Sequence, residues 1–208
     1  MIEFLVARPP DLLGFLFTAT VLVVSLTIHE FAHAAAATWQ GDPTARLAGR
    51  LTLNPMSHLD PVGSVMIVLV GFGWGKPVPF SPNKLRSRRF GAAFVGAAGP
   101  LTNIVLAFLA AFSLGFLRPA SFGGPAERFL GFALSINVVL AIFNLLPIPP
   151  LDGSRILTAL LPPARQHIIY FLDKWSFILL IVVAFLLFRP ILGPVVTFTI
   201  RLILRLAT

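Results

Sequence analysis

Residues 11–39 read DLLGFLFTATVLVVSLTIHEFAHAAAATW, an apolar stretch that is long enough to cross a bilayer as one helix. About 20 consecutive apolar residues suffice for such a crossing. After Asp11, the ionisable side chains of the stretch are those of His29, Glu30 and His33. Ionisable groups are costly inside a membrane, so a cluster of them there indicates a functional site. The stretch therefore predicts a membrane-spanning helix that carries a site near its far end.

The spacing of these three residues favours a metal site. On a helix, His29 and His33 lie on one face, where both imidazoles can reach a single zinc ion. Glu30 points in a neighbouring direction and can act as a general base toward water bound to that zinc. The alternative is a helix whose histidines only form hydrogen bonds with their neighbours. It is the weaker interpretation, because an apolar slab offers few partners to two imidazoles and a carboxylate.

The composition indicates an all-α polytopic membrane protein. Hydrophobic residues make up 57% of the chain and the mean hydropathy is +0.90, well above the level of soluble domains. The chain has no cysteine, which excludes disulfides and thiolate ligands, so a metal must be held by histidines and carboxylates. The net charge is +8. It does not indicate a nucleic-acid partner, because the basic residues lie mostly in short connections beside apolar spans.

We expect about five to six transmembrane helices in a single domain over residues 1–208. The first stretch is too long for a signal peptide. The later spans are expected at residues 91–117, 128–146, 166–188 and 190–207, with a turn at 118–127 and a hinge at Arg189-Pro190. Residues 62–82 are first apolar and then rich in proline and glycine. We interpret them as a small re-entrant or shallow element within a loop region of about 41–90.

The basic residues also predict the orientation of the spans. Placing residue 1 outside puts most arginines and lysines on the inner side, in agreement with the positive-inside rule. From Leu12 to His29 a helix rises ~26 Å, against a hydrocarbon core of ~30 Å. We therefore expect a multi-pass protein of the cell's inner or plasma membrane. Its site should lie within the bilayer, close to the cytosolic face.

Asp152 is the best candidate for a third metal ligand, which a catalytic zinc site needs besides a position for water. The span at 128–146 runs in the same direction as the first span, so it delivers Asp152 to the same face as the histidines. Pro147 breaks that helix, and Gly153 allows a sharp turn that can aim a carboxylate sideways. Alternatively, Asp152 is the N-cap of a helix that starts at Ser154, and both roles can hold at once.

His58 and Asp60 are rival ligands, because they follow the first span on the same inner side. His58 could instead donate a hydrogen bond to a developing oxyanion, or orient a zinc ligand. The alternative for His58 is a solvated histidine in a loop.

Three asparagines lie in or at the end of apolar spans, where a buried amide needs partners. Each could join helices together, or hold a substrate backbone and stabilise a tetrahedral intermediate. We favour the second role for Asn144, because it lies close to Asp152 in the sequence. Both roles remain open for Asn103, and we interpret Asn137 as structural.

Several blocks of this sequence resemble the site-2 proteases, the intramembrane zinc metalloproteases. The blocks are residues 27–34, 53–61 with 73–79, 98–103, and 144–153. The resemblance implies that His29, His33 and Asp152 bind one Zn²⁺ per chain, that Glu30 is the catalytic base, and that Asn144 assists substrate or intermediate binding. It also implies that residues 73–80 correspond to the family's re-entrant, β-like element, which aligns an extended substrate.

The expected function is hydrolysis of peptide bonds in transmembrane segments, as in regulated intramembrane proteolysis. Family substrates are often first trimmed by another protease. The chain has no room for a PDZ or CBS domain, so it is expected to be a minimal form. One alternative is a proton or metal-ion transporter, because intramembrane histidines and carboxylates also mark ion paths. A transporter is expected to have paired broken helices in two matching halves, and the sequence shows no such pair. Another is a non-catalytic module that binds membrane helices. The argument against it is that the set of candidate catalytic residues is complete: His29, Glu30, His33 and Asp152.

Overall fold

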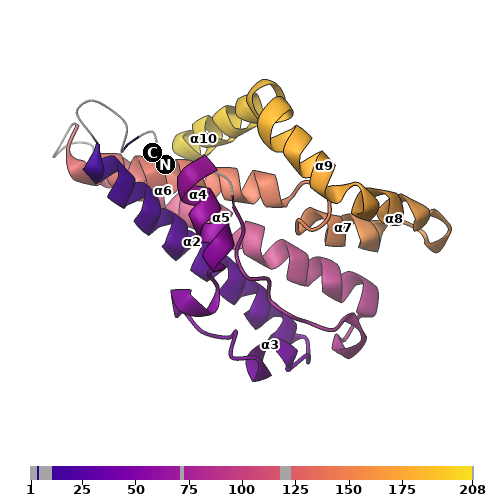
Figure 1. Cartoon of the computed structure of the whole chain (residues 1–208). Coiled ribbons are helices and arrows are strands. Elements are labelled where there is room, and N and C mark those ends of the chain that lie inside the picture. The colour runs from indigo at the N-terminus through magenta and orange to yellow at the C-terminus, as the bar shows by residue number, and fades with distance from the viewer. Residues whose placement is uncertain (1–3, 5–10, 71–72, 118–122, 208) are drawn as a thin grey trace.

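The protein is an all-α membrane protein, as its composition predicted (Figure 1). The computed structural model describes residues 4, 11–70, 73–117 and 123–207, and over these residues it contains no β-strand. Four described helices are long and apolar enough to cross a membrane, or five elements if one bent helix pair counts as a span. The sequence predicted five to six spans, and the described residues contain four candidates or at most five, so the exact number stays a prediction.

Helix α2, Leu12–Trp39, matches the first predicted span. Asp11 caps its beginning, because the carboxylate accepts a hydrogen bond from the Gly14 amide at 2.9 Å. The same carboxylate forms an ion pair with Arg128 at the start of helix α6, Pro125–Asn144. Gly41 follows the helix with φ +97°, a backbone conformation that favours glycine, and so the chain turns away at this point.

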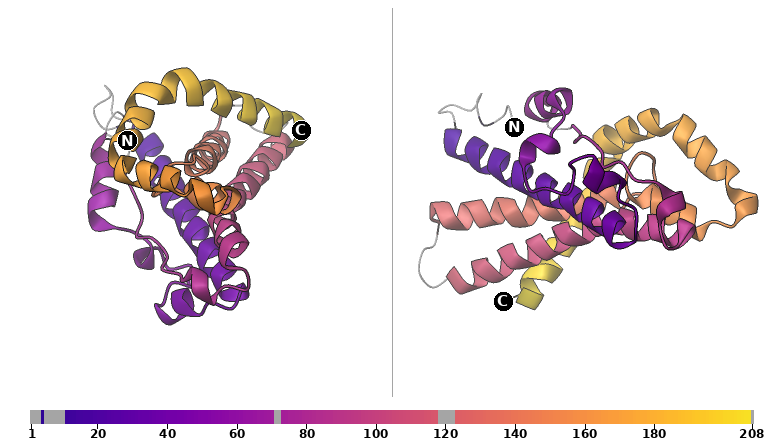
Figure 2. Two further views of the ribbon diagram at one scale, coloured as in Figure 1. Left: turned by 90° about the vertical axis from the view of Figure 1, so that its right-hand side faces the viewer. Right: turned by 90° about the horizontal axis from the view of Figure 1, so that it is seen from below.

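Helices α2, α5 and α6 lie side by side and form the body of the molecule (Figure 2). Helix α5, Arg88–Leu117, and α6 correspond to the predicted spans at 91–117 and 128–146. Small side chains such as Ala107 and Ala111 of α5 allow close packing against Val138 of α6. Ile203 of α10, Gly193–Ala207, completes this core. Of the turn predicted at 118–127, residues 118–122 lie outside the described residues, whereas Pro125 already begins α6, so the helix starts earlier than the sequence predicted.

The loop region after α2 holds short elements. They are α3 (Thr44–Leu47), η1 (Pro55–Ser57), α4 (Pro61–Val70) and η2 (Pro82–Lys84). Helix α4 has 10 residues, too few to span a bilayer. Residues 73–80 form no helix and run as an extended stretch (Figure 1), whose β-character is one isolated antiparallel bridge between Leu59 and Gly75.

The predicted span at 166–188 is wrong as a single straight helix. It consists of α8, His167–Lys174, and α9, Ser176–Ile181, with a bend of 67° at the break between them. Asp173 and Lys174 precede the break, and charged side chains favour water over hydrocarbon. The chain continues through a π-helical stretch, Val182–Leu192, that contains Pro190. Proline cannot donate the usual helical hydrogen bond, and the chain changes direction between α9 and α10 (Figure 1).

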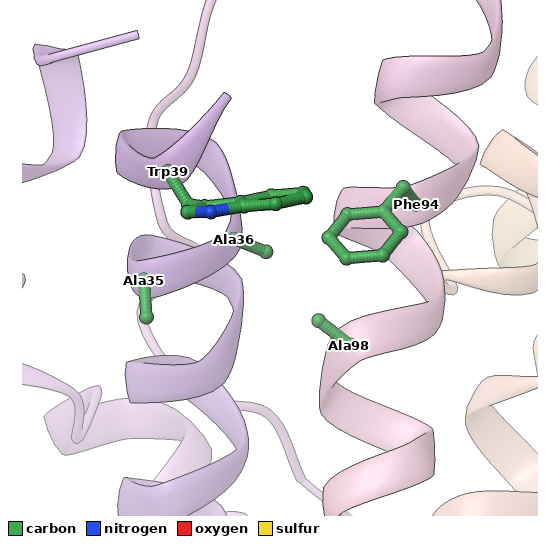
Figure 3. A pocket seen from close by; sticks show the side chains of 5 residues that line it. All are labelled: Ala35, Ala36, Trp39, Phe94 and Ala98. Carbon is green, nitrogen blue, oxygen red and sulfur yellow. The ribbon is translucent and has the colours of Figure 1, made fainter. Parts of the chain in front are cut away.

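A shallow apolar groove of about 380 Å³ lies between α2 and α5 (Figure 3). Ala35, Ala36 and Ala98 line it together with Trp39 and Phe94, whose rings lie 5.5 Å apart. Its lining offers no ionisable group, so the groove is separate from the polar site described next.

Candidate metal centre

The side chains of His29, His33 and Asp152 meet at one point between α2 and the start of α7, Gly153–Leu160. The two Nε2 atoms are 3.0 Å apart, and Asp152 Oδ2 lies 3.1 Å from His29 Nε2 and 3.2 Å from His33 Nε2. Ligands of a tetrahedral zinc ion, bound at ~2.0–2.2 Å, are about 3.3–3.6 Å apart. The triangle is therefore only slightly smaller than a zinc site requires. Both histidines are buried, and the aspartate is half-buried.

The protonation of the two imidazoles fits a cation at this point. His33 Nδ1 lies 2.7 Å from the backbone oxygen of Val95. A carbonyl oxygen only accepts hydrogen bonds, so Nδ1 carries the proton and a neutral ring presents the lone pair of Nε2 to the triangle. His29 Nδ1 has a partner too, Asn103 Oδ1 at 2.6 Å. Lone pairs and a carboxylate that face each other at about 3 Å repel unless a proton or a metal cation lies between them, and two nitrogens with one carboxylate oxygen are donors that zinc accepts.

Gly99 of α5 leaves the space beside these nitrogens, and the sequence interpretation missed it. A Cβ at this position would lie 2.5 Å from His33 Nε2 and 2.6 Å from His29 Nε2. Any side chain would therefore occupy the position of a metal or of its water. The signal was present in the block 98–103, where a glycine precedes Pro100, but its meaning depends on the packing of α5 against α2.

The aim of Asp152 depends on a tight turn after α6. A Cβ on Gly153 would lie 2.1 Å from the backbone oxygen of Leu145, so only glycine fits there. Asp152 stands at the N-cap position of α7, but its side chain forms no capping hydrogen bond, because it points toward the histidines. The helix begins at Gly153 rather than Ser154. On the α5 side, Gly96 allows close approach, since its Cβ would lie 2.9 Å from the backbone oxygen of Asp152.

The Glu30 carboxylate faces the extended segment 73–80. A Cβ on Gly75 would lie 3.6 Å from Glu30 Oε1. The backbone of this segment is held on one side, where Lys76 N donates to the backbone oxygen of His58 at 2.7 Å and Arg50 donates to the backbone oxygen of Lys76. Burial lowers the pKa of the Arg50 guanidinium, and the nearby Glu30 carboxylate raises it in part.

His58 and Asp60, the rival ligands, lie outside the triangle. His58 is completely buried, so the alternative of a solvated loop histidine is wrong. Its Nε2 donates to the backbone oxygen of Thr52 at 2.8 Å, and its Nδ1 is buried with no hydrogen-bond partner among the described residues. Asp60 accepts a hydrogen bond from the Gly63 amide at 2.8 Å, near the start of α4.

The three asparagines have different surroundings. Asn103 forms a hydrogen bond with His29, one of the three residues of the metal triangle (His29, His33 and Asp152). Its Nδ2 donates to Asn137 Oδ1 at 2.8 Å. Asn144 is half-buried, and its Nδ2 donates to the backbone oxygen of Leu140 in its own helix at 2.9 Å. A role for Asn144 toward a substrate therefore stays a prediction.

Comparison with known proteins agrees with this geometry. Residues 118–188 match peptidase family M50. The chain is 40% identical over 172 residues to YwhC of Bacillus subtilis, which covers 80% of this chain and 78% of that protein. It is 35% identical over 200 residues to Rip2 of Mycolicibacterium smegmatis (89% and 72%), and 34% identical over 170 residues to Rip2 of Mycobacterium tuberculosis H37Rv (77% and 63%). All three are named as zinc metalloproteases. No solved structure matches the chain.

Proposed function

Since this chain belongs to peptidase family M50 and is an intramembrane zinc metalloprotease, we propose that it cuts peptide bonds within transmembrane helices of protein substrates, with His29, His33 and Asp152 as the zinc ligands. The observation that supports this assignment is the triangle of two Nε2 atoms and one carboxylate oxygen with edges of 3.0–3.2 Å. The transporter and the non-catalytic module are not favoured.

The chemistry divides between the metal and the side chains around it. When bound, zinc acidifies water and polarises the scissile carbonyl as a Lewis acid. Glu30 is the general base: it takes a proton from the attacking water and passes it to the leaving amine. Asn144, close to the turn that carries Asp152, is proposed to hold the substrate backbone or the oxyanion. The substrate must unwind locally, because the hydrogen bonds of an intact helix hide its backbone.

The segment 73–80 is proposed to align that unwound stretch. It is extended, faces Glu30, and has the Lys76 amide and carbonyl already paired on one side. An extended peptide gains main-chain hydrogen bonds when it adds to an exposed edge of extended backbone. In this proposal the segment is the re-entrant, β-like element of a single membrane domain over residues 1–208.

The orientation of the site belongs to the proposal as well. The connection between α2 and α5 contains several basic residues, and Arg155 lies in the first turn of α7, near Asp152. The positive-inside rule places these connections in the cytosol. The metal would then lie near the cytosolic face of the cell's inner or plasma membrane, where water can reach it.

The proposal predicts that Glu30→Gln abolishes proteolysis while zinc stays bound. Loss of a general base costs about 10²–10⁴-fold in rate, whereas the three ligands are untouched. The measurement combines cleavage of a transmembrane substrate by detergent-solubilised protein with zinc content per chain. Glu127→Gln is the matched control, because Glu127 lies at the opposite end of α6, where it accepts from the Gly123 amide. Undiminished cleavage by Glu30→Gln, or wild-type protein that binds no zinc, would overturn the proposal.

A further inference from the structure

A chain of hydrogen bonds runs from His29 on α2 through one side chain each of α5 and α6 and returns to α2 at Ser25, four residues before His29. His29 Nδ1 meets Asn103 Oδ1 at 2.6 Å, Asn103 Nδ2 donates to Asn137 Oδ1 at 2.8 Å, and Asn137 Nδ2 donates to Ser25 Oγ at 2.9 Å. The four side chains come from α2, α5 and α6, and none is more than 3% exposed. Buried polar groups are costly without partners. Here each buried amide forms hydrogen bonds with the next side chain of the network.

The direction of these hydrogen bonds is fixed from one end. Asn137 Nδ2 also donates to the backbone oxygen of Ala133 at 2.8 Å. That oxygen can only accept, so the atom of Asn137 next to it must be the NH₂ group, and Oδ1 must face Asn103. Asn103 must then present its own NH₂ group to Asn137 and its Oδ1 to His29. As a result, His29 Nδ1 must carry a proton.

We propose that Asn137 is a positioning residue which, through Asn103, holds His29 in the Nδ1–H tautomer, so that its Nε2 lone pair points at the metal. The carbonyl of Ala133 thereby sets the protonation of a ring on a different helix. His33 reaches the same state by a shorter route, since its Nδ1 donates directly to the Val95 carbonyl. The inference rests on the proposed function only in taking zinc as the partner of Nε2. It also replaces the structural role that the sequence suggested for Asn137.

Nitrogen NMR of metal-free protein tests the tautomer directly. Selective ¹⁵N labelling of histidine gives four imidazoles, and His29 is assigned as the signal lost in His29→Ala. Protonated and bare ring nitrogens have very different shifts, so each tautomer is visible. Above the imidazole pKa, wild-type His29 should show protonated Nδ1 and bare Nε2. Asn137→Leu should give His29 a mixture of tautomers or the Nε2–H form, while His33 keeps its Nδ1–H form because Val95 is unchanged.

Matched variants separate this role from simple packing. Ser25→Ala removes the hydroxyl at the end of the chain but leaves the Ala133 carbonyl, so the His29 tautomer should persist. Thr102→Val, beside Asn103, removes a hydroxyl that donates to Ala98 in the same helix, and it should change nothing. The His33 signal reports whether each variant is folded around the site. If Asn137→Leu does not fold, the smaller Asn137→Ser decides. An Nδ1–H tautomer of His29 that persists in the folded Asn137 variant would overturn the proposal.

Zinc affinity, measured by competition with a chelator, gives a second readout. Removing an outer partner of a metal-bound histidine weakens binding by about 10–100-fold. Asn137→Leu should therefore weaken zinc binding at least about tenfold, and Ser25→Ala and Thr102→Val should stay near wild type. Failure of the proposed function looks different: wild-type protein would not bind zinc, whereas the dependence of the His29 tautomer on Asn137 would remain. Unchanged zinc affinity in a folded Asn137 variant would count against the positioning role.

Discussion

At the scale of single residues, the site depends on a missing side chain as well as on the side chains that line it. Gly99 contributes no side chain, and this absence is what leaves room beside the two Nε2 atoms. Arg50 contributes a buried guanidinium that holds the carbonyl of Lys76 and lies near Glu30. Neither residue ligates a metal in our proposal, yet both shape the space in which the ligands and the base work.

Gly99→Ala should remove zinc binding with a limited effect on folding. The new methyl group would lie about 2.5 Å from the ligand nitrogens, and overpacking costs about 1–3 kcal/mol. Gly131→Ala on α6 is the control, because a Cβ there meets nothing within 4 Å. Zinc content and thermal unfolding of the two variants are the measurements. A Gly99→Ala protein that holds wild-type zinc would show that the space beside the nitrogens is not used by the metal.

Arg50→Gln should slow proteolysis about tenfold or more while zinc content stays unchanged. Loss of the guanidinium frees the Lys76 carbonyl, and small misplacements of substrate-aligning groups cost large factors in rate. Arg50→Lys should restore activity only in part, because lysine lacks the planar fork of arginine. Steady-state cleavage of a transmembrane substrate together with metal analysis tests both variants. Loss of zinc in Arg50→Gln would contradict this separation of roles.

At the scale of elements, the extended segment is attached to the end of α2 through Asp42. Its carboxylate accepts hydrogen bonds from the Thr44 amide at 3.0 Å and from the Ser81 amide at 2.5 Å. Burial raises the pKa of the Asp42 carboxyl, but the hydrogen bonds from Thr44 and Ser81 lower it more, so the pKa lies below its ordinary value. The ionised form is therefore the one that stabilises this connection.

Acid should loosen this attachment in wild-type protein. Because the folded pKa of Asp42 is depressed, its stabilising contribution is complete above the ordinary aspartate pKa of about 3.9 and is lost as pH falls below it. Asp42→Asn should lower stability at neutral pH by about 1–3 kcal/mol and remove part of the loss between pH 7 and pH 3. Thermal unfolding in detergent at both pH values measures this, with the exposed Asp173→Asn as control. Equal pH dependence in wild type and Asp42→Asn would contradict it.

Two helical regions show where sequence patterns predict the structure well and where they fail. Helix α2 was predicted almost to the residue, because a long apolar run with a capping aspartate has no competing structure. The segment at 166–188 was predicted as one span because its average hydropathy is high, and an average conceals a local pair such as Asp173 and Lys174. These two charged residues directly precede the bend after α8.

At the scale of the whole molecule, the metal triangle joins segments that lie 119–123 residues apart in the sequence. Helix α5 lies against both, through Gly99 on the histidine side and Gly96 on the aspartate side. A zinc ion bound there would connect α2 with α7 and relieve the repulsion among three electron-rich atoms. We therefore expect metal binding and stability to be coupled.

Removal of zinc should lower the thermal stability of the protein. A ligand that binds only the folded state stabilises it by about 2.7 kcal/mol at one hundred times its Kd. Chelator-treated protein should unfold at a lower temperature, and added Zn²⁺ should restore the transition in a concentration-dependent way. Mg²⁺, which prefers oxygen ligands, is the control. If neither the chelator nor Zn²⁺ changes the unfolding temperature, the triangle carries no metal.

The three residues that we propose as zinc ligands could be found from the sequence, but the residues that surround them could not. His29, His33 and Asp152 belong to short patterns whose residue types and spacing point to metal chemistry. Gly99 and the role of Asn137 are defined by contacts between helices, and a single sequence contains no record of which faces of α5 and α6 meet. His58 was also ambiguous, because a loop position says nothing of whether the three-dimensional structure buries it.

The ion pair between Asp11 and Arg128 joins the beginnings of α2 and α6, at the ends of these helices that lie away from His29, His33 and Asp152. At their other ends, Asp152 follows α6 by a few residues and meets the histidines of α2. Because α2 and α6 contact each other near both ends, we expect them to stay together when a substrate helix enters. An incoming substrate helix should therefore approach from the side of α4 and the extended segment, and a disulfide between α2 and α6 should leave turnover intact.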